Sequence, residues 1–192
     1  MDEYYKYITD LNDKGGCWCA DYYGIFSKVI RDNNYKNVAE VGIGYGFHSR
    51  EILKNTNVEK HYMIDPMRDY DDGFAHDVKK HGTFDELYDK ISNMLGDYIK
   101  TKRCVWFRKP SIEITNEEIP DESLDAVFID GDHSYEAVLQ DLNFWWNKVR
   151  KGGQILGDDY PGFETVRRAV YEFSQSKGIS FDLLKKEIFF SI

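Results

Sequence analysis

Two separated blocks of this sequence carry residue types that could do chemistry together. Residues 40–46 (EVGIGYG) form a glycine-rich run, while residues 128–133 (FIDGDH) and 157–159 (GDD) carry aspartates after apolar segments. A glycine turn after a strand lets a nucleotide-like ligand approach the backbone closely. Carboxylates that converge from two strand ends suit a hard cation such as Mg²⁺, and His133, shortly after Asp130, is placed to act as a base. Together the blocks predict a metal-assisted group transfer rather than a binding module.

The length and charge of the chain limit the classes of protein that it can be. At 192 residues we expect one domain over 1–192, with an N-terminal helical cap region at 1–34 and a core at 35–192. The formal net charge of −9 argues against a broad basic surface, so no nucleic-acid partner is expected. No signal-peptide pattern and no membrane-spanning apolar run is evident, so no membrane partner is expected either.

The cysteines and the composition indicate the compartment. Cys17, Cys19 and Cys104 fit reduced thiols. Cys17 and Cys19 are too close for an ordinary disulfide loop, and a second ligand pair for zinc is lacking. The abundance of Tyr, Asn, Lys and Asp is typical of proteins from AT-rich bacterial or viral genomes. We therefore expect a cytoplasmic protein, in the host cytoplasm if the source is viral.

Apolar runs and helical patterns alternate along the chain. Strands are expected at 38–41, 61–64, 104–107, 124–129 and 154–156, followed by a hairpin of 179–184 and 188–192. Helices are expected at 3–12, 21–32, 47–53, 83–98, 134–149 and 164–176, and a turn at 151–153. This order predicts an α/β fold: a Rossmann-like, doubly wound sheet of seven strands, mostly parallel, with a C-terminal antiparallel hairpin and helices on both faces. Ligands of such sheets bind at the carboxyl ends of the strands.

The segment 67–82 is polar and is expected to form a long loop or an irregular lid. Thr83 and Glu86 have the spacing of a capping box at the start of the following helix. The residues that bind the acceptor are poorly determined. Candidates are the loop 67–82 and the aromatic residues Trp18, Tyr22, Tyr23, Tyr45 and Tyr160, whereas His76 and His81 are interpreted as ordinary loop residues.

The glycine run departs from the dinucleotide fingerprint. Gly42, Gly44 and Gly46 give G-x-G-x-G, in which the third glycine comes one residue early, and Glu40 precedes the first. A carboxylate there would repel a pyrophosphate but help to hold an amino group. Asp65, at the end of the next expected strand, can accept hydrogen bonds from both hydroxyls of a ribose. The pattern favours S-adenosylmethionine over NAD, although Glu40 and Asp65 could instead be a strand-end cap and a turn former.

With these residues the chain resembles the class I S-adenosylmethionine-dependent methyltransferases over roughly 35–192. Residues 40–46 are similar to their first motif, Asp65 to their ribose-binding acid, and Ser111 stands where the family often contacts the adenine. The terminal hairpin matches their antiparallel strand. The resemblance implies the following cofactor-binding residues: Glu40, Gly42, Gly44, Tyr45, Gly46, Asp65, Ser111 and Asp130.

The aspartate blocks resemble the metal-dependent O-methyltransferases, and most of all the branch that methylates sugar hydroxyls on natural products. That resemblance implies Mg²⁺ or Mn²⁺ on Asp130, Asp158 and Asp159, with His133 as base and Asp130 as its catalytic partner. Catechol-type relatives have asparagine where this chain has Asp159. Much of the sugar branch has glutamate where this chain has Asp158, so the metal geometry is less certain.

Purely structural roles for these residues, and other functions for the chain, stay open. Asp130 and Asp158 could be helix caps, His133 a packing residue, and Asp132 a solvated turn residue. The acceptor is expected to be a small molecule or a glycan with a hydroxyl group. A catechol or phenol acceptor, or a non-catalytic S-adenosylmethionine-binding partner subunit, is the alternative. The sequence leaves open whether the chain forms a homo-oligomer or is a domain of a larger protein.

Overall fold

The fold is seen in a computed structural model that describes residues 6, 23–69, 73–184 and 189–192. The helix expected at 3–12 and the acceptor candidates Trp18 and Tyr22 lie outside the described residues. Within them, no helix is both long enough and apolar enough to cross a membrane.

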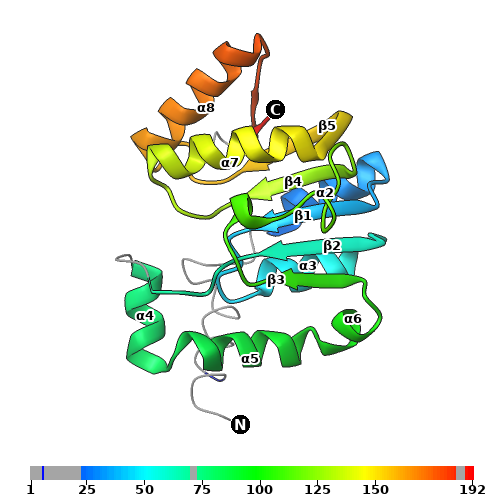
Figure 1. The fold of residues 1–192 in the computed structure, drawn as a ribbon, viewed down its shortest axis with the longest axis vertical. Coiled ribbons are helices and arrows are strands. Elements are labelled where there is room, and N and C mark those ends of the chain that lie inside the picture. Colours follow the sequence, from blue (N-terminus) through cyan, green and yellow to red (C-terminus); the bar gives the residue numbers. More distant parts are fainter. Residues whose placement is uncertain (1–5, 7–22, 70–72, 185–188) are drawn as a thin grey trace.

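A single sheet of seven strands forms the centre of the molecule (Figure 1). Its order is β3-β2-β1-β4-β5-β7-β6. The strands are β1 (Asn37–Val41), β2 (Lys60–Ile64), β3 (Cys104–Phe107), β4 (Leu124–Ile129), β5 (Val149–Gly157), β6 (Asp182–Leu184) and β7 (Phe189–Ser191). The pairings from β3 through β5 are parallel, and β7 runs antiparallel to both β5 and β6. The predicted α/β, Rossmann-like fold with its C-terminal hairpin is confirmed.

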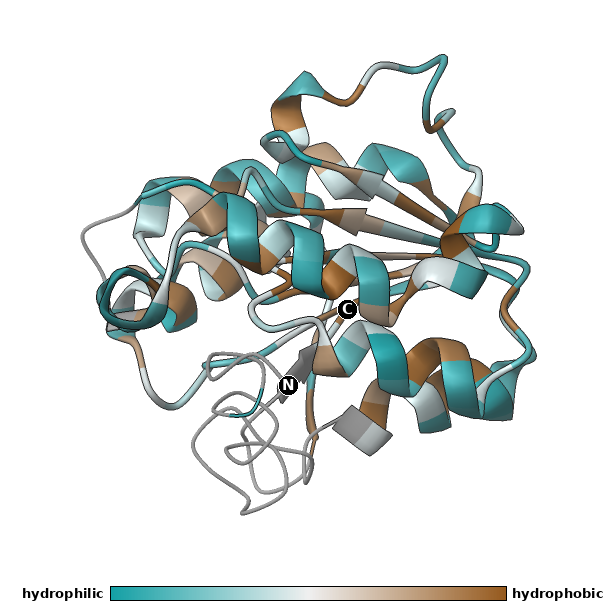
Figure 2. Ribbon diagram, turned by 90° about the horizontal axis from the view of Figure 1, so that it is seen from below, coloured by the Kyte–Doolittle hydropathy of each residue, from teal (hydrophilic) through white to brown (hydrophobic). Residues whose placement is uncertain are grey.

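Helices cover both faces of the sheet (Figure 1). They are α2 (Tyr23–Asn33), α3 (Phe47–Asn55), α4 (Gly73–His81), α5 (Phe84–Met94), α6 (Gly96–Lys100), the short 3₁₀ helix η1 (Ser111–Glu113), α7 (Tyr135–Lys148) and α8 (Glu164–Lys177). Alternate strand residues face opposite sides. On β4, Ala126 and Phe128 join the core beneath α2, α3 and α5, while Val127 and Ile129 join the core beneath α7 and α8. Figure 2 shows helices in which hydrophobic and hydrophilic residues alternate along the ribbon, as expected for helices with one face on the sheet.

Three expectations about the elements need correction. The segment 67–82 is not a loop throughout, because its second half forms α4, which buries Ala75 and Val78 at helical spacing. The helix expected at 83–98 does begin with the capping box of Thr83 and Glu86, but it is interrupted at Leu95, before the weak helix former Gly96, and continues as α6.

The expected turn at 151–153 is part of β5 instead. The register between β4 and β5 shifts between Leu124 and Ala126, and the glycines absorb this irregularity. Gly152 has φ +73°, and a Cβ on Gly153 would lie 2.4 Å from the carbonyl oxygen of Asp125. The strand therefore continues through a position that a larger side chain could not occupy.

Candidate active site

The residues singled out by the sequence meet along one edge of the sheet, where the parallel strands end. Each strand end is joined to its neighbour by one backbone hydrogen bond beyond the regular pairing. These bonds run from Asp65 N to Phe107 O (3.2 Å), Gly42 N to Ile64 O (3.0 Å), Asp130 N to Val41 O (2.8 Å) and Asp158 N to Ile129 O (3.2 Å). The strand order therefore arranges the site residues in a row, from Ser111 after β3 to the aspartate pair after β5.

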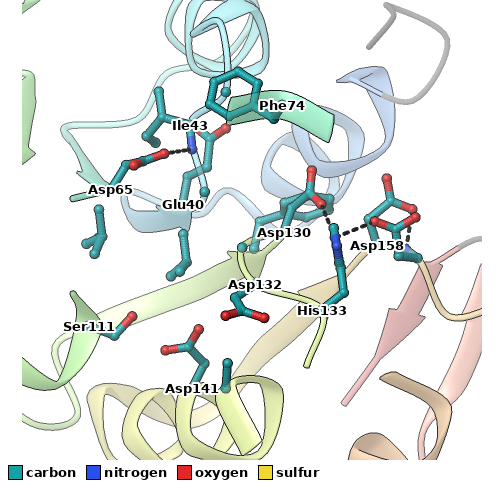
Figure 3. A pocket seen from close by; sticks show the side chains of 18 of the residues that line it. Glu40, Ile43, Asp65, Phe74, Ser111, Asp130, Asp132, His133, Asp141 and Asp158 are labelled. Atoms are coloured by element: carbon teal, nitrogen blue, oxygen red, sulfur yellow. Dashed lines mark hydrogen bonds and ion pairs between the residues drawn. The ribbon is translucent and has the colours of Figure 1, made fainter. Parts of the chain in front are cut away.

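A large cavity opens along this edge. Its volume is about 1230 Å³, which exceeds the range typical of a pocket for one small ligand. Every residue that the sequence assigned to cofactor, metal or catalysis lines it, except Gly46. Figure 3 shows Asp130, His133 and Asp158 at one side of the cavity and Ser111 with Asp141 at the other, with Ile43 near Asp65. One cavity thus has room for a cofactor and an acceptor together.

The glycine turn brings the ends of β1 and β4 into close contact. Gly42 has φ +83°, and a Cβ there would lie 1.9 Å from the carbonyl oxygen of Asp130. Gly44 and Gly46 also have positive φ, but Gly44 has open space around it, whereas a Cβ on Gly46 would press on Ile91 of α5. Only glycine fits Gly42 because both the conformation and the close approach exclude a side chain.

Asp65, at the end of the neighbouring strand β2, stabilises this turn by hydrogen bonds. Its Oδ2 accepts the backbone N–H of Ile43 at 2.8 Å, and its Oδ1 accepts that of Met67 at 2.7 Å. Burial raises the pKa of Asp65 above its usual value, although hydrogen bonds from backbone amides oppose the shift. Each carboxylate oxygen has two lone pairs, so Asp65 keeps acceptor capacity toward the cavity.

Glu40, which precedes the glycine turn, is the central residue of a buried polar network. Its oxygens contact His48 Nδ1 at 3.1 Å, Ser49 Oγ at 2.5 Å and His61 Nε2 at 3.0 Å. Burial alone would raise the pKa of Glu40, but the two histidines outweigh it and lower the pKa to about 2. Both oxygens are thus already engaged within the protein, which gives Glu40 a structural role whether or not it also contacts an amino group.

Asp130, His133 and Asp159 form the acidic side of the cavity. One potential ligand atom from each lies within 4.8 Å of the other two. The Nε2 atom of His133 is 2.7 Å from Asp159 Oδ2 and 3.8 Å from Asp130 Oδ1. Burial alone would lower the pKa of His133, but the neighbouring carboxylates of Asp130 and Asp159 outweigh it and raise the pKa to about 10. The carboxylates therefore draw a positive charge to this point, as a divalent-cation site must.

Asp158 lies beside these three residues, but its side chain is not part of the group whose potential ligand atoms lie within 4.8 Å of one another. Its Oδ1 accepts the backbone N–H of Asp159 at 2.6 Å. Burial, together with the neighbouring carboxylates of Asp130 and Asp159, raises the pKa of Asp158 to about 7. A carboxyl group surrounded by like charges is stabilised in its ionised form by a bound cation, so the residue chemistry fits Mg²⁺ or Mn²⁺.

Two residues that the sequence did not single out hold His133 in place. The imidazole stacks on Phe163, with ring centroids 4.4 Å apart and an interplanar angle of 13°. The Thr165 hydroxyl donates to the carbonyl oxygen of His133 at 2.6 Å. Phe163 precedes α8 and is one of the large apolar residues exposed on the surface, at 42%. An exposed aromatic residue just after the aspartate pair was the signal that could have revealed it.

A second missed residue, Asp141, lines the other side of the cavity. It lies on α7, one helical turn from both Ala137 and Trp145, on the face of the helix that meets the core. The Ser111 side chain lies beside Asp141 and lowers the pKa of its carboxyl group, and Trp145 Nε1 donates to Ser111 Oγ at 3.1 Å. A carboxylate on an inward-facing helical stripe was the signal for this residue.

The expected acceptor residues separate into two groups. Tyr45 lines the cavity, as do Phe74 on α4 and Arg68 in the preceding segment. Tyr160 instead packs against Phe181, with ring centroids 5.6 Å apart, and does not line the cavity. Likewise, neither His76 nor His81 lines it. The side chain of Tyr23 lies outside the described part of the chain.

Solved structures with the same fold include several methyltransferases. A Staphylococcus aureus protein provisionally assigned as a caffeoyl-CoA O-methyltransferase matches with a TM-score of 0.68 and 15% identity, over 98% of this chain and 89% of that one. The O-methyltransferase NovP matches with a TM-score of 0.60 and 19% identity, over 86% and 74%. TomG of Streptomyces achromogenes, solved with S-adenosylmethionine, gives 0.58 and 10%, over 88% and 77%. At these identities the likeness shows the fold.

The comparison with curated sequences gives a short match. The uncharacterized protein R132 of Acanthamoeba polyphaga mimivirus is 48% identical over 40 residues, which is 21% of this chain and 18% of that protein. A family model for a methyltransferase domain matches residues 39–160, which is more than half of the chain. This match contains the glycine turn, Asp65 and the acidic cluster, and the chain therefore belongs to the methyltransferase domain family.

Proposed function

We propose that this chain is an S-adenosylmethionine-dependent O-methyltransferase that uses Mg²⁺ or Mn²⁺ and methylates a hydroxyl group of a sugar or glycosylated acceptor. The observation that carries the proposal is that Asp130, His133 and Asp159 share one cavity with the glycine turn and Asp65. An adenosine-recognising half and a cation-attracting half within one volume are what metal-assisted transfer from a nucleoside cofactor requires.

The cofactor half is assigned from the order of strand ends. Asp65 would accept the ribose hydroxyls, and the turn over 42–46 would hold the methionine part of the cofactor. Asp130, which follows β4 beside the end of β1, would then border the part of the cofactor that supplies the methyl group. The turn supplies close backbone approach, and Asp65 supplies fixed acceptors, so together they hold the cofactor in one orientation.

The acidic half supplies activation of the acceptor. Asp130, Asp158 and Asp159 would hold a divalent cation, which lowers the pKa of a nearby hydroxyl group and balances the charge of the carboxylates. A cation on Asp130 and Asp159 would also remove the cause of the raised pKa of His133, so that its neutral imidazole would accept the hydroxyl proton at Nε2 as the oxygen forms its bond to the methyl carbon and the carbon–sulfur bond breaks. Phe163 and Thr165 fix the ring and the backbone of His133, so that its Nε2 stays directed toward Asp130 and Asp159.

A phenolic acceptor is the second candidate. The Staphylococcus aureus structure, provisionally assigned as a caffeoyl-CoA O-methyltransferase, aligns with 98% of this chain. The pair Asp158 and Asp159 favours the sugar acceptor, since the catechol-type pattern places asparagine at the second position.

The test is transfer of a labelled methyl group from S-adenosylmethionine to parallel panels of glycosides and catechols. We expect labelled glycoside in the presence of Mg²⁺, loss of the product with EDTA, and a roughly 10²–10⁴-fold lower rate for His133→Asn. Full activity in EDTA would refute the metal assignment. Labelling confined to catechols would replace the sugar acceptor with the phenolic one.

A further inference from the structure

One carboxyl group on the cavity wall has no part in the chemistry proposed above. Asp141 lies on α7, and its Oδ2 is 4.0 Å from the position that a Cβ on Gly131 would take. It also meets Ser111 in η1, which follows β3. Asp141 therefore lies where the segments that follow β3 and β4 border the cavity, away from the aspartate pair after β5 (Figure 3).

Two neighbouring side chains, Ser111 and Trp145, position this carboxyl group. Trp145 is fully buried, and its Nε1 donates to Ser111 Oγ at 3.1 Å. Because Ser111 Oγ accepts from Trp145, its one hydroxyl hydrogen is left for the Asp141 carboxylate beside it, and this neighbour lowers the pKa of Asp141. A single hydrogen can serve only one of the two oxygens of Asp141. Among the described residues the structure records no further donor to this carboxyl group.

This arrangement costs stability in the free protein. Burial, with a contribution from the nearby Asp132 carboxylate, raises the pKa of Asp141 to about 6, despite the hydrogen bond from Ser111. A carboxyl group that is desolvated by the protein, is served by a single donor and faces a cavity is suited to a ligand that donates a hydrogen bond.

The row of strand ends indicates which part of a ligand lies there. With the ribose on Asp65 after β2 and the methionine part on the glycine turn after β1, the base extends toward Ser111 after β3. Pro66, Pro110 and Ala137 line the cavity and offer apolar surfaces to a flat ring, and Gly131 leaves room for it. An adenine ring carries one strong hydrogen-bond donor on its outer edge, which is the amino group at C6.

We propose that Asp141 selects the adenine of the cofactor by accepting a hydrogen bond from this amino group, with Ser111 and Trp145 as positioning residues. The inference rests on the proposed function because it assumes an adenosine cofactor. It also changes the role expected for Ser111, which acts on the base through Asp141. A purine with a carbonyl oxygen at C6 would face the carboxylate with a second acceptor and would be rejected.

The experiment compares binding of S-adenosylhomocysteine with binding of S-inosylhomocysteine, in which a carbonyl oxygen replaces the amino group, by calorimetry on the full chain. We expect the wild type to prefer the adenosine compound by about 10- to 100-fold. In Asp141→Ala this preference should fall to within a few fold. In Asp141→Asn, which keeps the shape and adds an N–H donor, binding of the inosine compound should improve relative to wild type.

Glu136→Gln is the matched control, since it removes one acidic charge from the exposed first turn of the same helix. It should keep the wild-type preference. Equal binding of both compounds by the wild type, or an unchanged preference in both Asp141 variants, would overturn the role of Asp141 and leave the proposed function standing. Failure of the wild type to bind either compound would overturn both.

Discussion

His133 and Asp159 lie on loops that follow different strands, yet His133 Nε2 and Asp159 Oδ2 are 2.7 Å apart. The neighbouring strands β4 and β5 end side by side and bring the two loops together. Asp159 has φ +62°, an unusual conformation for a residue other than glycine. The pairing therefore uses a backbone conformation that aspartate and asparagine tolerate better than most residues, and this guides the choice of variants.

Asp159→Asn tests the cation site without disturbing this conformation. We expect at least a tenfold loss of Mn²⁺ affinity, because a neutral amide replaces a carboxylate ligand. Electron paramagnetic resonance of free Mn²⁺ measures it directly. Asp97→Asn is the control, since Asp97 is fully exposed on α6 and should bind as the wild type does. Equal affinity in wild type and Asp159→Asn would remove Asp159 from the proposed ligand set.

Glu40→Gln tests the buried network. The pKa of Glu40 falls from 4.5 to about 2 on folding, so its contribution to stability is present above pH 4.5 and lost as the pH falls toward 2. The pKa of His48 is raised from 6.5, because Glu40 outweighs burial, so its contribution is complete below pH 6.5 and lost at higher pH. The variant should therefore lose most stability between about pH 4.5 and 6.5, by on the order of 2–4 kcal/mol. Urea unfolding across pH measures this, and a deficit independent of pH would contradict the account.

Gly42→Ala and Gly44→Ala form a matched pair. Both residues have positive φ, so each substitution should cost about 1–2 kcal/mol of folding stability. Only at Gly42 would the new Cβ collide with the backbone of Asp130, which should add roughly 1–3 kcal/mol. Thermal unfolding without ligand compares the two. Equal losses would show that the close contact between the ends of β1 and β4 is not energetically important.

Asp141→Asn should stabilise the free protein in a pH-dependent manner. The pKa of Asp141 is raised from 3.8 to about 6, so ionisation opposes folding above pH 6 and has no effect below 3.8. At pH 8 the free energy of unfolding of the variant should exceed that of the wild type by about 1–2 kcal/mol, and near pH 3.5 the two should be equal. Thermal unfolding at the two pH values measures this difference. A variant that is less stable than the wild type at pH 8 would contradict the assignment of an uncompensated carboxylate.

The sequence predicted those parts of the site that depend on strand order alone. Asp65, Asp130 and Asp158 each follow an apolar run, and parallel strands bring such residues to one edge. The capping box of Thr83 and Glu86 was predicted equally well, because both partners lie within one helical turn.

The rest depends on contacts between distant segments. Asp141 borders the cavity only because η1 meets α7, and Phe163 matters only because it stacks on His133. The polar segment 67–82 concealed α4, because the helix is held by a few buried positions such as Ala75 and Val78 among charged neighbours. Asp158 was expected among the ligands as an equal of Asp159, but its hydrogen bond to the Asp159 amide became visible only in three dimensions.

The most direct test of the account is a calorimetric titration of the purified chain with S-adenosylmethionine, with NAD⁺ as the control ligand. We predict a dissociation constant in the micromolar range for S-adenosylmethionine and no measurable heat with NAD⁺. Binding of NAD⁺ alone, or of neither compound, would contradict the central claim that the glycine turn and Asp65 hold an S-adenosylmethionine cofactor.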